Sequence, residues 1–165
     1  MIEQKFYKIV DAVKHAVRVS SEKRKYSFNL TTAGFLIESV FNKAKTTGTY
    51  VAVAIADEDG RIFACKSMRD TDKEHLSTAS NKAFTAAVLK MSTVQVGELS
   101  ADGKALYGIK KTNNGKIETS AGGNPIICCG RVIGGMGVSG ADEQTNMQLS
   151  IYGASLIDKI IKEYK

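Results

Sequence analysis

The sequence is short of the features that mark several large classes of protein. In 165 residues it has no tryptophan, one proline and three cysteines. Two of the cysteines, Cys128 and Cys129, are adjacent, and an odd set with this spacing does not build a disulfide framework. No His/Cys cluster has the spacing of a metal site. We therefore predict no metal site, and cysteines that are small buried apolar side chains in a reducing compartment.

Long apolar runs are also missing. None approaches the roughly 20 residues that a membrane span needs, and the first residues lack the apolar core of a secretory signal. We therefore expect a cytoplasmic protein with no membrane span. The net charge of +6 is uneven, since residues 1–25 hold seven basic and three acidic residues, a net +4. After residue 25 there is no basic stripe with interleaved aromatics, so we predict no nucleic-acid partner.

The charge and apolar patterns divide the chain into two parts, residues 1–28 and a domain over residues 29–165. Residues 2–18 predict a basic amphipathic helix, and residues 20–27 read as a polar linker. The apolar stripe of this helix consists of Ile2, Phe6, Ile9, Val10, Val13 and Val17.

Three destinations are open for the segment 1–19. Its apolar stripe can fill a groove on a partner protein, as encapsulation peptides of bacterial microcompartments do. It can also fold back onto this protein's own sheet or onto a neighbouring subunit. Attachment to a membrane surface is the weaker alternative, because Glu3 and Asp11 lie on the polar face and tryptophan is absent.

In the domain over residues 29–165 the sequence predicts helices that alternate with β-hairpins. Thr31 or Thr32 can cap a helix that stops at Gly48, and residues 73–91 predict a long helix with a small, alanine-rich face. Residues 142–164 predict the last helix. The predicted strands are 50–56 and 61–67, joined by a turn at 57–60, then a short strand 116–120, and a central hairpin of 126–129 and 132–138 around Gly130-Arg131.

This order contains hairpins and no series of strand-helix-strand crossovers. It therefore predicts an α+β fold, a sandwich in which helices pack on an antiparallel sheet of about five strands. Neither Gly-x-Gly-x-x-Gly before a helix nor a Walker-type Gly-Lys-Ser/Thr is present, which argues against a nucleotide-binding fold.

The stretch from Gly122 to Gly140 holds the only proline and seven of the fifteen glycines. Glycine weakens a strand unless something must come close to its backbone. Gly134, Gly135 and Gly137 therefore predict close approach by a helix, a partner chain or a flat ligand. Packing alone is the simpler explanation.

Five motifs in order resemble the GlcG/HbpS family, which includes the C-terminal domain of PduO-type corrinoid adenosyltransferases. They are Asp57-x-x-Gly60, Ala79-x-x-Lys82-Ala83-x-x-Ala86, Leu106-Tyr107-Gly108-Ile109, Gly122-Gly123-x-Pro125 and Gly130-x-Val132 to Gly140. The resemblance covers about residues 30–160. It implies a profilin-like fold, assembly into dimers or larger oligomers and, as in some members, haem binding. The adenosyltransferase domain of PduO has no counterpart here, so adenosylation is not implied.

The chain departs from the family pattern in two loops. Ser67 to Asp72 stands where the family usually has Arg-Met-Asp-Gly-Ala, with one residue fewer before the helix, and Thr145-Asn146 replaces the usual Gln-Asp at the start of the last helix. Both changes fall where a ligand pocket is expected, so the precise site stays open.

A haem site needs a flat apolar slot, an axial ligand and cations for the propionates. His75, at the start of the long helix, is the better-placed candidate ligand, and His15 is the other; both also suit exposed surface positions. Arg69 and Lys82 are candidate partners for propionates, although Lys82 can equally pair with an acid across the sheet.

No paired-carboxylate, Ser-His-Asp or Cys-His arrangement stands at a recognisable spacing, so an enzymatic role is left undecided. Asp57 is the best-matched carboxylate, but its place in a hairpin turn suits closing that turn. Haem breakdown could be reductant-driven chemistry of bound iron.

We therefore predict an oligomeric module that binds a small ligand, haem or a related tetrapyrrole, as an accessory protein of a corrinoid-linked or microcompartment pathway. The alternatives are a structural or scaffolding subunit of the same fold without ligand, and a haem-degrading enzyme.

Overall fold

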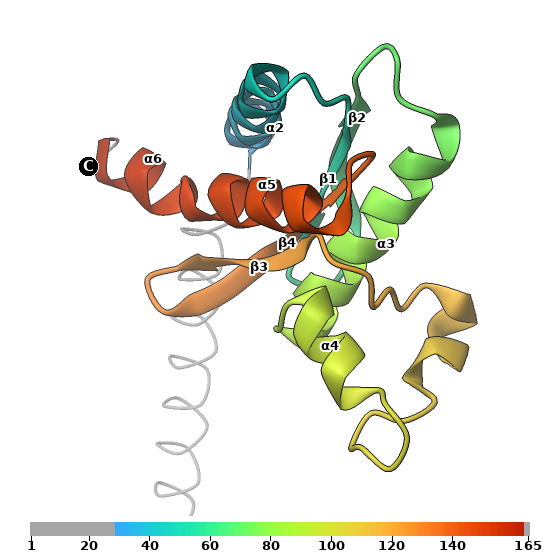
Figure 1. Ribbon diagram of the computed structural model, residues 1–165. Coiled ribbons are helices and arrows are strands. Elements are labelled where there is room, and N and C mark those ends of the chain that lie inside the picture. The colour runs from blue at the N-terminus through green and yellow to red at the C-terminus, as the bar shows by residue number, and fades with distance from the viewer. Residues whose placement is uncertain (1–28, 164–165) are drawn as a thin grey trace, which may run out of the picture.

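The computed structural model describes residues 29–163. The predictions for residues 1–28, including the amphipathic helix and His15, therefore lie outside the described residues. In the described part, four antiparallel strands form one sheet with helices on both faces (Figure 1), which confirms the α+β prediction. The strands in spatial order are β2 (Ile62–Ser67), β1 (Ala52–Asp57), β4 (Arg131–Ser139) and β3 (Gly123–Cys128).

The sheet differs from the prediction in two respects. Residues 116–120 form no strand, so the described sheet has four strands in place of about five. The glycine-rich hairpin is not wholly central, because β3 pairs with β4 alone and lies at an edge. Pro125 explains this position, since a residue without an N–H is tolerated in an edge strand. The central pair is β1 and β4.

Strand β1 is buried on both faces, as its continuous apolar run predicted. Val53 and Ile55 of the strand, with Val51 just before it, join a cluster of large apolar residues under α2 (Leu30–Thr46), α5 (Glu143–Ser155) and α6 (Ile157–Glu163). We call this side the large-residue face. Its even-numbered alanines from Ala52 to Ala56 meet α3 (Lys73–Leu89), which covers the opposite, small-residue face.

Local signals explain most helix boundaries. The N-cap of helix α2 is Asn29, two or three residues before the predicted caps, and its side chain accepts a 2.7 Å hydrogen bond from the main-chain N–H of Thr32. The predicted last helix is divided into α5 and α6 at Leu156. Helix α4 (Thr93–Leu99) was not predicted, although Ser92 and Gln95 form a capping box that marks its start.

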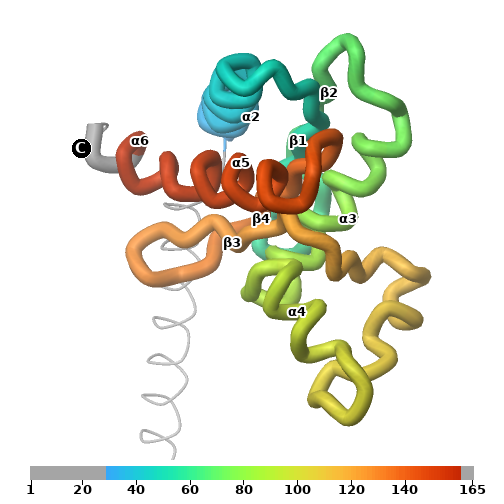
Figure 2. Tube along the Cα trace, viewed as in Figure 1, coloured from blue at the N-terminus to red at the C-terminus, as the bar shows by residue number. Residues whose placement is uncertain are grey.

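Between α4 and β3 the chain loops away from the sheet (Figure 2). This stretch holds two short 3₁₀ turns, Ile109–Lys111 and Asn113–Gly115. From 101 to 116 no residue is buried, and Leu106 and Ile109 are the partly buried ones.

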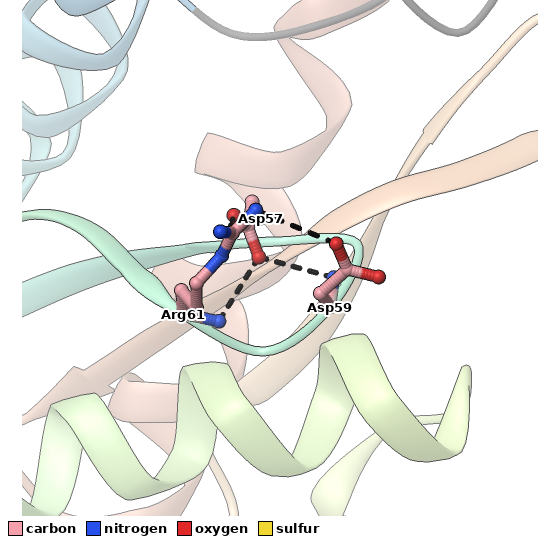
Figure 3. Close-up of polar contacts among 3 residues, drawn as sticks. All are labelled: Asp57, Asp59 and Arg61. Carbon is pink, nitrogen blue, oxygen red and sulfur yellow. Dashed lines mark hydrogen bonds and ion pairs between the residues drawn. The ribbon is translucent and has the colours of Figure 1, made fainter. Parts of the chain in front are cut away.

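The turn between β1 and β2 is closed by Asp57, as the sequence predicted. Its Oδ1 accepts hydrogen bonds from the main-chain N–H groups of Asp59 (3.0 Å) and Arg61 (2.9 Å). Its Oδ2 accepts from the Arg61 guanidinium at 3.0 Å (Figure 3). Both carboxylate oxygens of Asp57 are therefore engaged in the turn that it closes.

Candidate functional site

One pocket of the structure contains a residue predicted from the sequence as a ligand. It has a volume of about 310 Å³ and lies where three connections meet: α2 to β1, β2 to α3 and β4 to α5. His75 stands in its wall. The other lining residues are Gly48, Thr49, Tyr50, Asp70, Thr71, Asp72 and Gly140.

His75 is held from behind by the sheet. It lies in the first turn of α3, and its ring Nδ1 is 3.0 Å from the hydroxyl oxygen of Ser139, the last residue of β4. Ser139 is buried, whereas His75 is partly exposed. Among the described residues no partner occupies the second ring nitrogen, Nε2. The arrangement fixes one nitrogen and leaves the other for a ligand, as in many metal-binding histidines.

A serine hydroxyl against a histidine is also half of a nucleophilic dyad. Ser139 is only 4 % exposed and does not line the pocket. Its hydroxyl is therefore poorly accessible to a substrate carbonyl. The pair therefore suits the positioning of His75 and not acyl transfer.

The pocket wall is polar, and one of its groups lacks a partner. The Thr71 hydroxyl oxygen is inaccessible to solvent and makes no hydrogen bond within the described residues. Asp72 precedes α3 without capping it through its side chain, and Asp70 adds a second carboxylate to the wall. Tyr50 contributes an exposed aromatic ring.

Lys82 lies two helical turns after His75 on α3 and is buried, with 3 % exposure. Its ammonium donates hydrogen bonds to the main-chain oxygens of Ala121 (2.7 Å) and Val138 (3.2 Å). This ties α3 to β4 and to the chain before β3. The sequence predicted a propionate or an acidic side chain as the partner of Lys82, and did not predict these two main-chain carbonyls. The buried ammonium does not line the pocket.

Two electrostatic effects shift the pKa of Lys82 in opposite directions. Burial lowers its pKa, while the nearby carboxylates of Glu118 and Glu143 act to raise it. Burial also acts to raise the pKa of Glu118. The hydrogen bonds that Glu118 accepts from Ser120 and Thr119, together with the charge of Lys82, outweigh that cost, so its pKa is lowered.

The glycines of β4 are occupied by helix packing. A Cβ added at Gly137 would overlap the carbonyl oxygen of Ala79, and one at Gly135 would overlap that of Ala83. Helix α3 thus rests directly on the backbone of β4, and the packing explanation is confirmed for these two positions. Gly134 is buried in the same strand.

Arg69 is exposed in the turn before the pocket, next to Asp70.

The departure from the family pattern at Thr145-Asn146 has a structural role. Asn146 exchanges hydrogen bonds with the main chain of Ala141, at 3.2 and 2.6 Å. It therefore braces the connection that carries Gly140 to the pocket.

Three residues of the site were not predicted from the sequence: Tyr50 and Thr71, which line the pocket, and Ser139, the hydrogen-bond partner of His75. Thr71 lies in the loop Ser67 to Asp72, where a pocket was expected, and Ser139 lies at the end of the glycine-rich strand. The partner of Ser139 is 64 residues away in the chain, so no local spacing pointed to the pair.

Among the described residues, no group of three or more His, Cys, Asp or Glu side chains could hold a metal ion. No helix in this part of the chain is long and apolar enough to cross a membrane.

Comparison with known proteins gives a family match. The model of the family described as haem degrading protein HbpS-like matches residues 28–155. An uncharacterized 15.0 kDa protein from the dhaT-dhaS intergenic region of Citrobacter freundii is 30% identical over 124 residues, 75% of this chain and 87% of that protein.

Two solved structures are similar over most of the chain. Protein ORFY of Klebsiella pneumoniae has a TM-score of 0.75 and 27% identity, covering 79% of this chain and 90% of its own. A PduOC:haem complex has a TM-score of 0.73 and 26% identity, covering 78% of this chain and 94% of its own. The resemblance inferred from the five sequence motifs is thereby confirmed.

Proposed function

This chain belongs to the HbpS-like family of haem-degrading proteins, and from that premise we propose that it binds haem or a related tetrapyrrole. The observation that carries the proposal is His75, which lines a pocket with one ring nitrogen held by Ser139. Imidazole is a common axial ligand of haem iron. The likeness to a PduOC:haem complex supports the same ligand class.

The pocket has a residue that can ligate haem iron, but it is too small and too polar to enclose the whole ring. Ligand pockets run from about 300 to 1,000 Å³ and are mostly apolar. This one has about 310 Å³ and includes two carboxylates, Asp70 and Asp72, in its wall. One chain therefore offers an axial ligand and one polar edge. We propose that a second copy covers the rest of the ring, which makes the binding unit a homo-oligomer.

The roles of the remaining candidate residues follow from their positions. His75 would be the axial ligand, with Ser139 as its positioning residue. Arg69, exposed beside the pocket, would pair with a propionate. Lys82, Gly135 and Gly137 would support the site by holding α3 on β4, without touching the ligand. When bound, haem would supply an iron centre for small ligands and electrons.

Titration of the full chain with haemin tests this proposal. For the wild type we expect a saturable Soret band at micromolar protein. For His75→Ala we expect the band to shift in position and the affinity for haemin to fall at least about tenfold. Ser139→Ala should weaken binding less. His15→Ala is the matched control, because it removes the other histidine and should leave the band unchanged.

The outcomes separate the ligand from the residue. No saturable band in the wild type would exclude haem as the ligand. An unchanged band in His75→Ala would keep haem binding but reject the pocket at His75. A band lost in His15→Ala alone would move the axial ligand to the N-terminal segment.

A scaffolding subunit without ligand is the second candidate. It is favoured by one observation: α3 packs on Gly135 and Gly137, the glycine-rich surface for which a flat ligand was one of the predicted occupants. Light scattering with and without haemin distinguishes the two candidates. A stable oligomer of unchanged size that binds no haemin would support the scaffold, whereas a monomer would contradict both.

A protein partner or a microcompartment shell, reached through residues 1–19, is a further proposal. Fusing residues 1–19 to a reporter protein tests it.

A further inference from the structure

The hairpin between β3 and β4 ends in two adjacent cysteines with unequal exposure. Cys128, the last residue of β3, is 1 % exposed, and Cys129 is exposed at the tip of the turn. Their sulfur atoms are 3.8 Å apart. Cys129 and Gly130 both have positive φ, 49° and 76°, which is the geometry of a type I′ turn. An accessible thiol therefore stands directly against a second, sheltered one.

We propose that Cys128 and Cys129 are a peroxide-reactive thiol pair that closes to a reversible disulfide between neighbouring residues. The inference does not depend on haem binding. A low-molecular-weight hydroperoxide is the oxidant, and the exposed Cys129 is the residue it meets first. Reactive redox cysteines are accessible and often have a resolving cysteine beside them.

The chemistry balances in two steps. The Cys129 thiolate attacks one peroxide oxygen, the O–O bond breaks, and Cys129 becomes a sulfenic acid as water or an alcohol leaves with the proton. The Cys128 sulfur then attacks the Cys129 sulfur, the S–O bond breaks and water leaves. The two thiols are oxidised by two electrons, and the peroxide is reduced by the same two.

The position of the pair explains why this disulfide would be reversible. The Cα atoms of neighbouring residues are about 3.8 Å apart, closer than the roughly 4.4–6.8 Å usual for disulfides. A bond forced into this span is strained and easily reduced by small thiols. The sulfurs must approach from 3.8 Å to about 2 Å, which requires side-chain rotation within the turn.

Cys65 provides an internal control. It is exposed on β2, at the opposite edge of the sheet from β3. Two strands lie between these edges, so Cys65 cannot resolve a sulfenic acid on Cys129 within one chain. Cys65→Ser should therefore leave the reaction of the pair intact.

The test treats reduced full-length protein, without added haem, with hydrogen peroxide and maps the products by mass spectrometry. We expect loss of two thiols, a peptide about 2 Da lighter that contains both cysteines, and recovery with dithiothreitol. In Cys128→Ala, dimedone should trap a sulfenic acid on Cys129. In Cys129→Ser, the sheltered Cys128 should react at least about tenfold more slowly. Circular dichroism verifies folding, with Cys128→Ser as the substitute if Cys128→Ala is unfolded.

Three results would overturn the proposal. One is a dimedone adduct on Cys129 that forms as readily in the wild type as in Cys128→Ala. Another is direct oxidation of Cys129 to sulfinic acid with no linked peptide. The third is a chain-to-chain disulfide through Cys65 that accounts for all the lost thiol.

Discussion

The two faces of the sheet are packed on opposite principles. On the large-residue face, α2, α5 and α6 meet the sheet through side chains such as Leu36, Ile55 and Met136, all fully buried. On the small-residue face, α3 meets it through alanines and the backbone of Gly135 and Gly137. The first face depends on large side chains that fill the space under its helices, and the second depends on small residues that leave room for α3.

The faces also differ in how their helices are fixed. Close contact over alanine and glycine buries little apolar area per residue, so it contributes less than a leucine-rich contact. Helix α3 compensates with buried polar groups: Lys82 bonds to Ala121 and Val138, and the Thr85 hydroxyl accepts from the N–H of Glu118. These directional bonds fix the position of the helix, and so of His75. The small-residue face therefore positions the candidate site.

Removing volume from the large-residue face should have the largest effect. Leu36→Ala deletes a fully buried side chain from α2 and leaves a cavity against the sheet. We expect the free energy of unfolding to fall by about 3–5 kcal/mol, measured by urea denaturation followed by circular dichroism. Ile151→Ala on α5, where the side chain is 50 % exposed, is the control and should cost less than about 1 kcal/mol. Equal costs would mean that burial does not distinguish these positions.

Adding volume to the small-residue face should come next. Gly137→Ala places a Cβ into the carbonyl oxygen of Ala79 and 2.6 Å from the main-chain nitrogen of Ala83, so α3 must move. We expect a loss of about 2–3 kcal/mol in urea denaturation. Gly34→Ala is the matched control, since its Cβ meets nothing within 4 Å in α2, and it should stabilise by up to about 1 kcal/mol. A neutral Gly137→Ala would show that the two faces tolerate added volume alike.

The sequence predicted the arrangement of the faces better than the identity of their contacts. The alanine spacing of residues 79–87 and the glycines of β4 both indicated close approach, and the helix proved to fill that space. Residues 116–120 were misassigned, because an alternating pattern is met equally by an extended segment that pairs with no strand. Edge position was also missed for β3, although Pro125 marks it.

The candidate site was predictable only in part. His75 was singled out from its place at a helix start, and the structure adds a pocket around it. Tyr50 reaches that pocket, and Ser139 reaches His75, from distant parts of the chain, and no periodicity relates either residue to His75. The acceptors of Lys82 were unpredictable for another reason: they are main-chain carbonyls, which every residue carries.

Cutting the polar tie of the small-residue face should have a smaller effect than either volume change. Lys82→Met keeps the length of the side chain but leaves the carbonyls of Ala121 and Val138 without their charged donor. Because the substitution also removes the cost of burying a charge, we expect a net loss of about 2 kcal/mol at pH 7. Thermal and urea unfolding measure it. A variant more stable than the wild type would mean that burial of the ammonium costs more than its bonds contribute.

The same substitution has a pH signature. The pKa of Lys82 is lowered in the folded protein, so the unfolded chain binds more protons between that value and 10.5. Wild-type stability therefore gains from this group as pH rises through the lowered pKa toward 10.5. The destabilisation by Lys82→Met should grow from pH 7 to pH 10. A difference that shrinks with pH would indicate a raised pKa.

The smallest predicted effect concerns Glu118, at the polar border of the small-residue face. Its carboxylate accepts hydrogen bonds from the main-chain N–H groups of Thr119 and Ser120 and from the Ser120 hydroxyl, and its folded-state pKa is lowered from 4.5. A lowered acid pKa contributes stability that is present above 4.5 and is lost as pH falls through the folded value. Glu118→Gln should cost less than about 1 kcal/mol at pH 7, because an amide oxygen still accepts hydrogen bonds. It should also reduce the loss of stability below pH 4.5. Urea unfolding at pH 7 and pH 4 measures both effects, and an acid-induced loss identical to the wild type would place the responsible carboxylates elsewhere.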